Sequence, residues 1–104
     1  MTSLDERANG DTVTITPGAR LVLALPENPT TGYRWRLLAA GAPVLQLLDQ
    51  GFTPGPPRPG AGGTHHWAWQ AAQPGEAALR LDHARSWGEE PPVRQFTLTV
   101  RVGG

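Results

Sequence analysis

Three histidines and two serines are the side chains of this sequence that could hold a metal ion or carry out catalysis. His65 and His66 are adjacent, and adjacent residues of a strand point to opposite faces, so this pair is poorly placed to share one ion. No cysteine is present, and no well-spaced carboxylate completes a ligand set with His83. Neither Ser3 nor Ser86 lies in the strand-turn-helix context of an activated serine nucleophile. We therefore expect no metal, no cofactor and no catalytic residue.

A glycine-rich segment, residues 60–63, is another candidate for chemistry, because glycine-rich loops can cradle phosphate. Here the segment leads into a predicted strand, so the polarised helix N-terminus that assists a phosphate loop is missing. One interpretation is a structural loop. The other is a contact surface, because without side chains the backbone N–H and C=O groups can be approached by a partner.

The composition is that of a small folded domain without a strong charge. The chain has 104 residues, a hydrophobic content of 38% and a formal net charge of zero, and we expect one domain over residues 1–104. Neutrality argues against nucleic acid or an anionic membrane as the main partner. We expect a monomer when the protein is free. No apolar stretch is long enough to span a membrane.

The first residues are polar and do not resemble a signal peptide, with charges at Asp5, Glu6 and Arg7. We expect residues 1–10 to be a flexible N-terminus. The sequence as written is that of a cytoplasmic protein, although an exported protein whose signal had been removed would look the same.

Thirteen glycines and eleven prolines divide the chain into short segments, in most of which apolar and polar residues alternate. Tyr33 and Trp35 alternate with Arg34 and Arg36, which is typical of a strand with one solvent-facing side. Residues 44–52 are ambiguous, because part of this segment could also form one or two helical turns. The turn signals predict an all-β fold, which we interpret as an immunoglobulin-like antiparallel β-sandwich of about seven strands without a disulfide. The expected strands are residues 11–16, 20–25, 32–38, 44–52, 64–71, 76–83 and 92–102.

Three of the connections between these strands are longer than tight turns, and in the immunoglobulin topology they share one end of the sandwich. They cover residues 28–33, 54–64 and 85–91. Binding residues concentrate on loops that a rigid scaffold holds in place, so we expect the function at this end.

The first of these connections holds a polar tip between two conformational restraints. Pro29 fixes its own φ angle and favours an extended conformation for Asn28. Gly32 can adopt the positive φ with which the chain turns back into the next strand. Thr30 and Thr31 lie between them and are stiff about χ1 because they are β-branched. The segment is either an ordinary polar turn or a rigid binding tip.

The third connection carries an aromatic residue, Trp87, between Ser86 and Gly88. A tryptophan at a loop tip either packs onto the core or is exposed as an anchor for a partner. Arg85 can pair with one of the nearby acidic residues, Glu89 or Glu90, which would brace the loop.

Together the three segments resemble the motifs of the chagasin family of inhibitors of papain-like cysteine proteases. The family pattern is an NPTTG loop followed by tyrosine or phenylalanine, a GxGG loop before a strand, and an RPW loop on an immunoglobulin-like fold. Residues 28–33 match the first motif, residues 60–63 the second, and residues 85–87 the third with Ser86 in place of proline. His83 stands where relatives often have tyrosine. The resemblance covers essentially the whole chain.

The resemblance implies a reversible, non-covalent blockade of the protease's active-site cleft. The threonines of the first loop would cover the catalytic cysteine, and the glycine-rich loop would pair with enzyme backbone on one side of the cleft. The tryptophan would pack against an enzyme aromatic on the other side. Ser86 would leave the third loop freer before binding and so weaken or slow complex formation. The resemblance assigns protease binding to Asn28, Pro29, Thr30, Thr31, Gly32, Tyr33, Gly60, Ala61, Gly62, Gly63, Arg85 and Trp87.

Two other function classes stay open from the residues alone. A non-inhibitory immunoglobulin-like module that binds glycans or a surface protein would need Trp87 exposed on a flat face, with no wedge at Thr30 and Thr31. An enzyme would need a catalytic constellation, and the sequence shows none.

Overall fold

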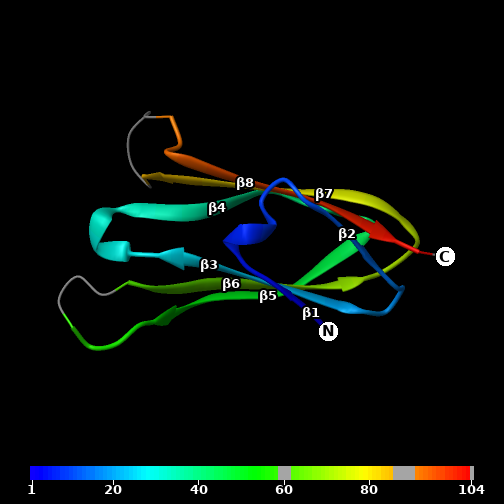
Figure 1. Cartoon of the computed structure of the whole chain (residues 1–104), viewed down its shortest axis with the longest axis horizontal. Coiled ribbons are helices and arrows are strands. Elements are labelled where there is room, and N and C mark those ends of the chain that lie inside the picture. The colour runs from blue at the N-terminus through cyan, green and yellow to red at the C-terminus, as the bar shows by residue number, and fades with distance from the viewer. Residues whose placement is uncertain (59–61, 86–90, 104) are drawn as a thin grey trace.

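Two four-stranded β-sheets pack face to face in the structure, a computed structural model that describes residues 1–58, 62–85 and 91–103 (Figure 1). The elements are β1 (Thr2–Leu4), η1 (Glu6–Ala8), β2 (Thr12–Ile15), β3 (Arg20–Glu27), η2 (Pro29–Thr31), β4 (Tyr33–Ala40), β5 (Leu45–Pro54), β6 (Gly63–Ala71), β7 (Gly75–Arg85) and β8 (Arg94–Val102). One sheet has the order β1-β3-β6-β5 and the other β2-β8-β7-β4. The predicted all-β sandwich is confirmed, with eight strands among the described residues where about seven were expected.

The core between the sheets is built from the alternating apolar residues of the strands. Trp67 and Trp69 of β6 have no exposed surface, and Phe96 and Leu98 of β8 belong to the same buried cluster. An aromatic side chain of this kind buries roughly 150–250 Å², which at about 25 cal/mol per Å² is about 4–6 kcal/mol. Because the chain has no cysteine, this packing takes the place of the disulfide found in many immunoglobulin-like domains.

Residues 44–52, for which strand and helix were both open, lie almost entirely in β5. The register between β5 and β6 shifts between Leu47 and Asp49, so that Leu48 is an extra residue in the strand. Such a bulge interrupts the alternation of a strand. The interruption explains why the consecutive leucines at 47 and 48 also fitted a helical turn.

Residues 1–10 were expected to be flexible, but they hold regular structure. β1 pairs in parallel with the first half of β3, and η1 follows it. The Asp5 side chain caps η1 by accepting a hydrogen bond from the Arg7 N–H at 2.9 Å, and Ala8 is buried against the core. A three-residue strand is too short to show an alternation, so β1 could not be predicted from the sequence pattern.

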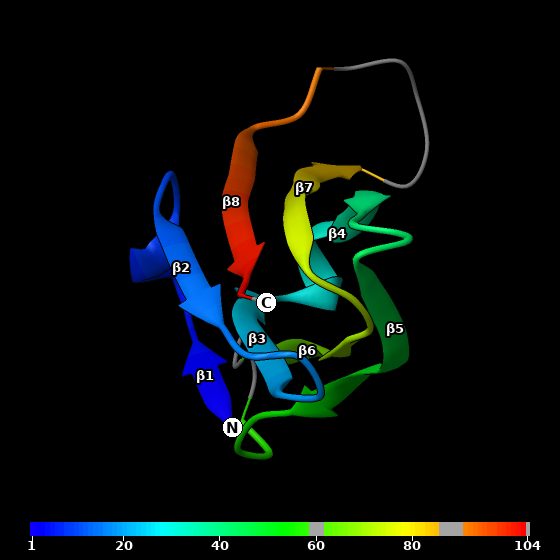
Figure 2. The same cartoon turned by 90° about the vertical axis from the view of Figure 1, so that its right-hand side faces the viewer.

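The described ends of the β3–β4, β5–β6 and β7–β8 connections lie at one end of the sandwich, at the left in Figure 1. The turn between β6 and β7 lies at the other end. Figure 2 shows β1 and β2 on one side of the molecule and β4 and β5 on the other, as the strand orders require. No helix within the described ranges is both long and apolar enough to cross a membrane.

Candidate functional site

The connection between β3 and β4 is a single 3-10 turn held by its own side chains. Asn28 precedes the turn in an extended conformation (φ −118°, ψ 100°). Its Oδ1 accepts hydrogen bonds from the Thr30 N–H at 3.2 Å and from the Thr30 hydroxyl at 2.7 Å. The Thr31 hydroxyl donates to the Asn28 carbonyl at 2.8 Å and accepts from the Tyr33 N–H at 3.3 Å. These side chains pair with backbone groups that a short turn would otherwise leave unpaired.

The two conformational restraints predicted for this loop are present. Pro29 occupies the start of the turn, where the missing N–H is not needed. Gly32 has a φ of 81°, in the left-handed region, and its N–H donates to the Pro29 carbonyl at 3.1 Å. Thr30 and Thr31 are exposed at the tip. The first loop is therefore a preformed polar tip.

The second connection packs against the first through a glycine. The Gly55 N–H donates to the Gly62 carbonyl at 2.9 Å, which closes the base of the β5–β6 connection. A Cβ atom on Gly62 would lie 3.1 Å from the Glu27 carbonyl oxygen and 3.3 Å from the Asn28 Cβ. The missing side chain thus makes room for a contact inside the protein, which agrees with the structural interpretation of this segment.

The third connection, between β7 and β8, is held at both of its ends: its first end lies beside β4 and its last end beside β7. Tyr33 of β4 is paired with Arg85 of β7, and the Arg85 guanidinium lies 5.0 Å from the centre of the Tyr33 ring, within cation–π range. The Val93 N–H donates to the His83 carbonyl at 2.9 Å, which closes the base of this connection. The first and third loops are thereby joined at their bases.

Part of the predicted binding set lies outside the described residues. It comprises Gly60, Ala61 and Trp87; Ser86, Glu89 and Glu90, named beside that set, also lie outside the described residues. The exposure of Trp87 and the pairing of Arg85 with an acidic neighbour therefore stay predictions. The described members, residues 28–33 with Gly62, Gly63 and Arg85, are brought together at one end of the sandwich.

His83 connects β7 to β4 beneath the third loop. Its ring stacks on the Trp35 ring, with centres 4.5 Å apart and an interplanar angle of 11°, and it meets the Tyr33 ring edge-on at 5.9 Å. Burial, and then the positive charge of Arg94, lower the pKa of His83 below its usual value of 6.5. The imidazole is therefore neutral at pH 7 and packs as an aromatic ring.

A buried carboxylate lies at the base of the first loop. Glu27 ends β3 with only 3% of its side chain exposed, and its Oε2 accepts a hydrogen bond from the Trp35 N–H at 2.7 Å. The same oxygen lies 3.2 Å from Nδ1 of His65 on β6. The Trp35 indole N–H donates to the Pro26 carbonyl at 2.9 Å. Glu27 thus links three strands drawn from both sheets at the point where the first loop begins.

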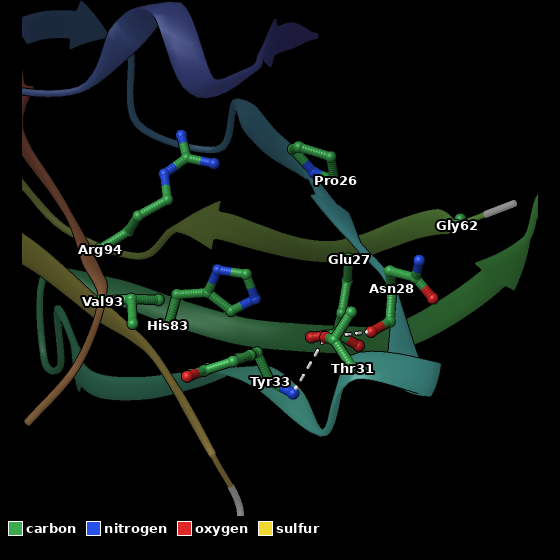
Figure 3. Close-up of a pocket in the computed structure, with 10 residues that line it drawn as sticks. Pro26, Glu27, Asn28, Thr31, Tyr33, Gly62, His83, Val93 and Arg94 are labelled. Atoms are coloured by element: carbon green, nitrogen blue, oxygen red, sulfur yellow. Dashed lines mark hydrogen bonds between the residues drawn. The ribbon is translucent and has the colours of Figure 1, made fainter. Parts of the chain in front are cut away.

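An open hollow of about 430 Å³ lies next to Glu27, between the first loop and the start of β8 (Figure 3). Glu27 and Thr31 line it on one side and Val93 and Arg94 on the other, with His83 and Tyr33 between them. In the described part of the chain, no group of three or more histidine, cysteine or acidic side chains could hold a metal ion. The site offers a hydrogen-bonded polar tip beside apolar contact area, which suit binding.

Comparison with known proteins identifies the family. The sequence model described as chagasin family peptidase inhibitor I42 matches residues 14–102. The chain belongs to the chagasin family. It is 36% identical to amoebiasin-1 of Entamoeba histolytica over 103 residues, which cover 96% of this chain and 98% of that protein. It is 29% identical to chagasin of Trypanosoma cruzi, over 90% of this chain and 91% of that one.

A solved structure agrees with this chagasin-family assignment at the level of the fold. The crystal structure of a cysteine protease inhibitor from Entamoeba histolytica superposes with a TM-score of 0.84, over 97% of this chain and 93% of that one. The sequence identity in that comparison is 20%. The two proteins therefore share the same sandwich.

The residues at the site of this chagasin-family protein that were absent from the predicted binding set include Glu27, His65, Val93 and Arg94. For two of them a signal was present. Glu27 continues the inward-facing period of Leu21, Leu23 and Leu25 along β3, and His65 continues that of Trp67 and Trp69 along β6. A charged residue and a histidine at core-facing positions of neighbouring strands predict a buried pair.

Proposed function

We propose that this chagasin-family protein is a reversible, tight-binding inhibitor of papain-like cysteine proteases. Three adjacent loops, residues 28–33, 54–64 and 85–91, would occlude the active-site cleft. Membership in a family of peptidase inhibitors supports inhibition over a non-inhibitory binding module. The observation that carries the mode of binding is the first loop, whose tip is held by the Asn28 and Thr31 side chains.

A preformed tip suits occlusion because binding then requires little ordering of the chain, and that preorganisation strengthens affinity. Thr30 and Thr31 are exposed at the end of the molecule, with Gly32 turning the chain directly behind them. We assign these two threonines to the centre of the cleft, over the catalytic cysteine. The tip carries no thiol and no activated nucleophile, so the blockade is steric and non-covalent.

The loops on either side extend the contact surface. Gly62 packs on Asn28 and Arg85 lies over the Tyr33 ring, so the bases of the second and third loops are fixed relative to the tip. We assign the backbone of residues 60–63 to one side of the cleft and Trp87 to the other. A tryptophan anchor of this kind is a typical hot spot and commonly contributes about 2 kcal/mol or more.

Inhibition assays test the proposal. The pure protein is incubated with papain and with a cathepsin L-like enzyme, and activity is followed with a small fluorogenic substrate. We expect competitive inhibition that reverses on dilution, with the intact masses of both proteins unchanged. Absence of inhibition at micromolar concentration against several such enzymes would overturn it.

A pair of insertions tests the assigned surface. Two glycines inserted between Thr30 and Thr31 separate Thr31 from the Asn28 carbonyl, which accepts from its N–H and its hydroxyl, and should abolish inhibition. The same insertion between Gln73 and Pro74, in the turn at the other end of the sandwich, should leave inhibition unchanged. Equal inhibition by both variants means that another surface binds the protease.

A further inference from the structure

We infer that Glu27 is a positioning residue for protease binding: it holds the first loop in its binding conformation by accepting the Trp35 N–H and facing His65. The inference rests on the proposed function. Glu27 itself is 4% exposed, so it offers almost no surface to a protease. Its effect on binding would therefore be exerted through the loop that begins at the next residue.

β4 lies at the edge of its sheet. Within its sheet β4 has β7 as its neighbour on one side only. The Trp35 N–H donates to the Glu27 carboxylate at 2.7 Å in place of a strand partner. A hydrogen bond to an ionised acceptor is shorter and about twice as strong as one between neutral groups. The carboxylate therefore fixes where β4 starts relative to the end of β3.

A second hydrogen bond reinforces the first. The Trp35 indole N–H donates to the Pro26 carbonyl at 2.9 Å. Pro26 and Glu27 precede the turn, and Trp35 follows it, so these two bonds clamp the chain on both sides of residues 28–32. With its ends clamped, the turn is closed by its own Asn28 and Thr31 side chains.

His65 extends the clamp to the second loop. The Nδ1 of His65 lies 3.2 Å from the Glu27 Oε2, and the tautomer with a hydrogen on Nδ1 donates to this oxygen. The His65 ring stacks on the buried Trp67 ring, with centres 4.1 Å apart and an interplanar angle of 6°. β6 starts at Gly63, two residues before His65. Glu27 thus aligns the first loop with the base of the second.

Stability alone does not account for a carboxylate at this position. The preceding inward positions of β3 are all leucine, and an apolar residue would continue the core. A buried ionised group is costly unless it is paired, and replacing a buried pair by apolar residues is often neutral or stabilising. The geometric role, which an apolar residue could not perform, is the one we assign.

The affinity for a protease depends on how much of the free protein has its first loop in the binding conformation. If the free protein holds the binding conformation only part of the time, the apparent affinity falls by that fraction. If loss of the clamp reduces the binding-competent fraction tenfold, inhibition weakens about tenfold, mainly because association becomes slower.

Three variants of the full chain, assayed for association with and dissociation from papain, test the inference. Glu27→Ala removes both interactions and is expected to slow association about tenfold. Glu27→Gln keeps an oxygen that can accept the Trp35 N–H and should restore association to within about threefold of wild type. Glu76→Ala is the matched control, because Glu76 is exposed and pairs with Arg101 at 3.0 Å on another part of the molecule.

Amide hydrogen exchange of the free variants separates positioning from general destabilisation. In Glu27→Ala the amides of Thr31, Gly32 and Trp35 should exchange faster, while those of Leu98 and Val100 in the core keep wild-type rates. If Glu27→Ala does not fold, His65→Ala removes one arm of the clamp and is expected to slow association about threefold.

The outcomes distinguish this inference from the proposed function. Wild-type association by folded Glu27→Ala, or a loss that Glu27→Gln does not restore, overturns the positioning role and leaves the inhibitor assignment intact. A wild-type chain that inhibits no papain-like enzyme overturns the proposed function. Hydrogen exchange then still decides whether Glu27 holds the loop.

Discussion

Replacing Gly62 by alanine tests whether the first and second loops act as one unit. The φ of Gly62 lies outside the left-handed region, so alanine adds no backbone strain there. Its Cβ would lie 3.1 Å from the Glu27 carbonyl oxygen and 3.3 Å from the Asn28 Cβ, closer than an ordinary van der Waals contact. Because the Glu27 side chain is anchored to Trp35, the displacement of a few tenths of an ångström should fall on Asn28 and the turn.

The expected effects on stability and on binding are of similar size, so a control variant must separate them. Overpacking costs about 1–3 kcal/mol, and the loss of glycine's freedom in the unfolded chain offsets about 0.4–1 kcal/mol of it. We expect the unfolding free energy to fall by at most about 2.6 kcal/mol. A displaced tip should weaken binding by about 1–2 kcal/mol, which raises the inhibition constant about 5- to 30-fold.

Gly18→Ala provides the matched control. Gly18 has a φ of 84° and no atom within 4 Å of the position of a Cβ. Alanine there is strained by about 1–2 kcal/mol but touches nothing, and the turn lies away from the three loops. Urea unfolding and papain inhibition are measured for both variants. We expect Gly18→Ala to lose stability with an unchanged inhibition constant.

Two results would show that the two loops do not act as one unit. A wild-type inhibition constant for Gly62→Ala would show that the contact between the loops does not matter for binding. An equal rise for Gly18→Ala would show that inhibition follows overall stability and not the geometry of the tip.

Three further predictions concern single side chains. Asn28→Ala removes the acceptor of two hydrogen bonds from Thr30, and urea unfolding should show a loss of about 1 kcal/mol; an unchanged midpoint contradicts the capping role. Because burial and Arg94 lower the pKa of His83, the unfolded chain binds that proton more readily, so stability is complete above about pH 6.5 and falls as the pH drops through the lower folded-state pKa. The unfolding free energy of His83→Phe should therefore fall less between pH 7 and pH 5 than that of wild type, and identical slopes contradict this. Trp87→Ala should raise the inhibition constant about 30-fold, equivalent to about 2 kcal/mol, with unchanged thermal stability; wild-type potency shows that the indole is no anchor.

The sandwich could be predicted from sequence because its core strands alternate over many residues. Phe96, Leu98, Val100 and Val102 follow one face of β8 without interruption, and all four are buried. The conformation of the first loop could also be predicted from sequence, because those of Asn28 and Gly32 follow from the local preferences of proline and glycine.

Features that depend on partners distant in sequence could not be predicted in the same way. β1 is defined by its pairing with β3, and three polar and apolar residues alone do not indicate a strand. The role of Gly62 depends on the position of Asn28, which is 34 residues away and comes close only after folding. Glu27 is an intermediate case, because its inward position follows from the period of β3 but its two partners do not.

The central claim is that the end of the sandwich bearing the three loops enters the protease cleft. The most direct measurement is NMR mapping of the labelled chain bound to papain whose catalytic cysteine has been replaced by alanine. We predict that the largest amide shift changes fall in residues 28–33, 62–64 and 91–94, with Arg85, and that a small active-site inhibitor reverses them. Shift changes confined to the opposite end, at residues 17–19 and 72–75, would contradict the account.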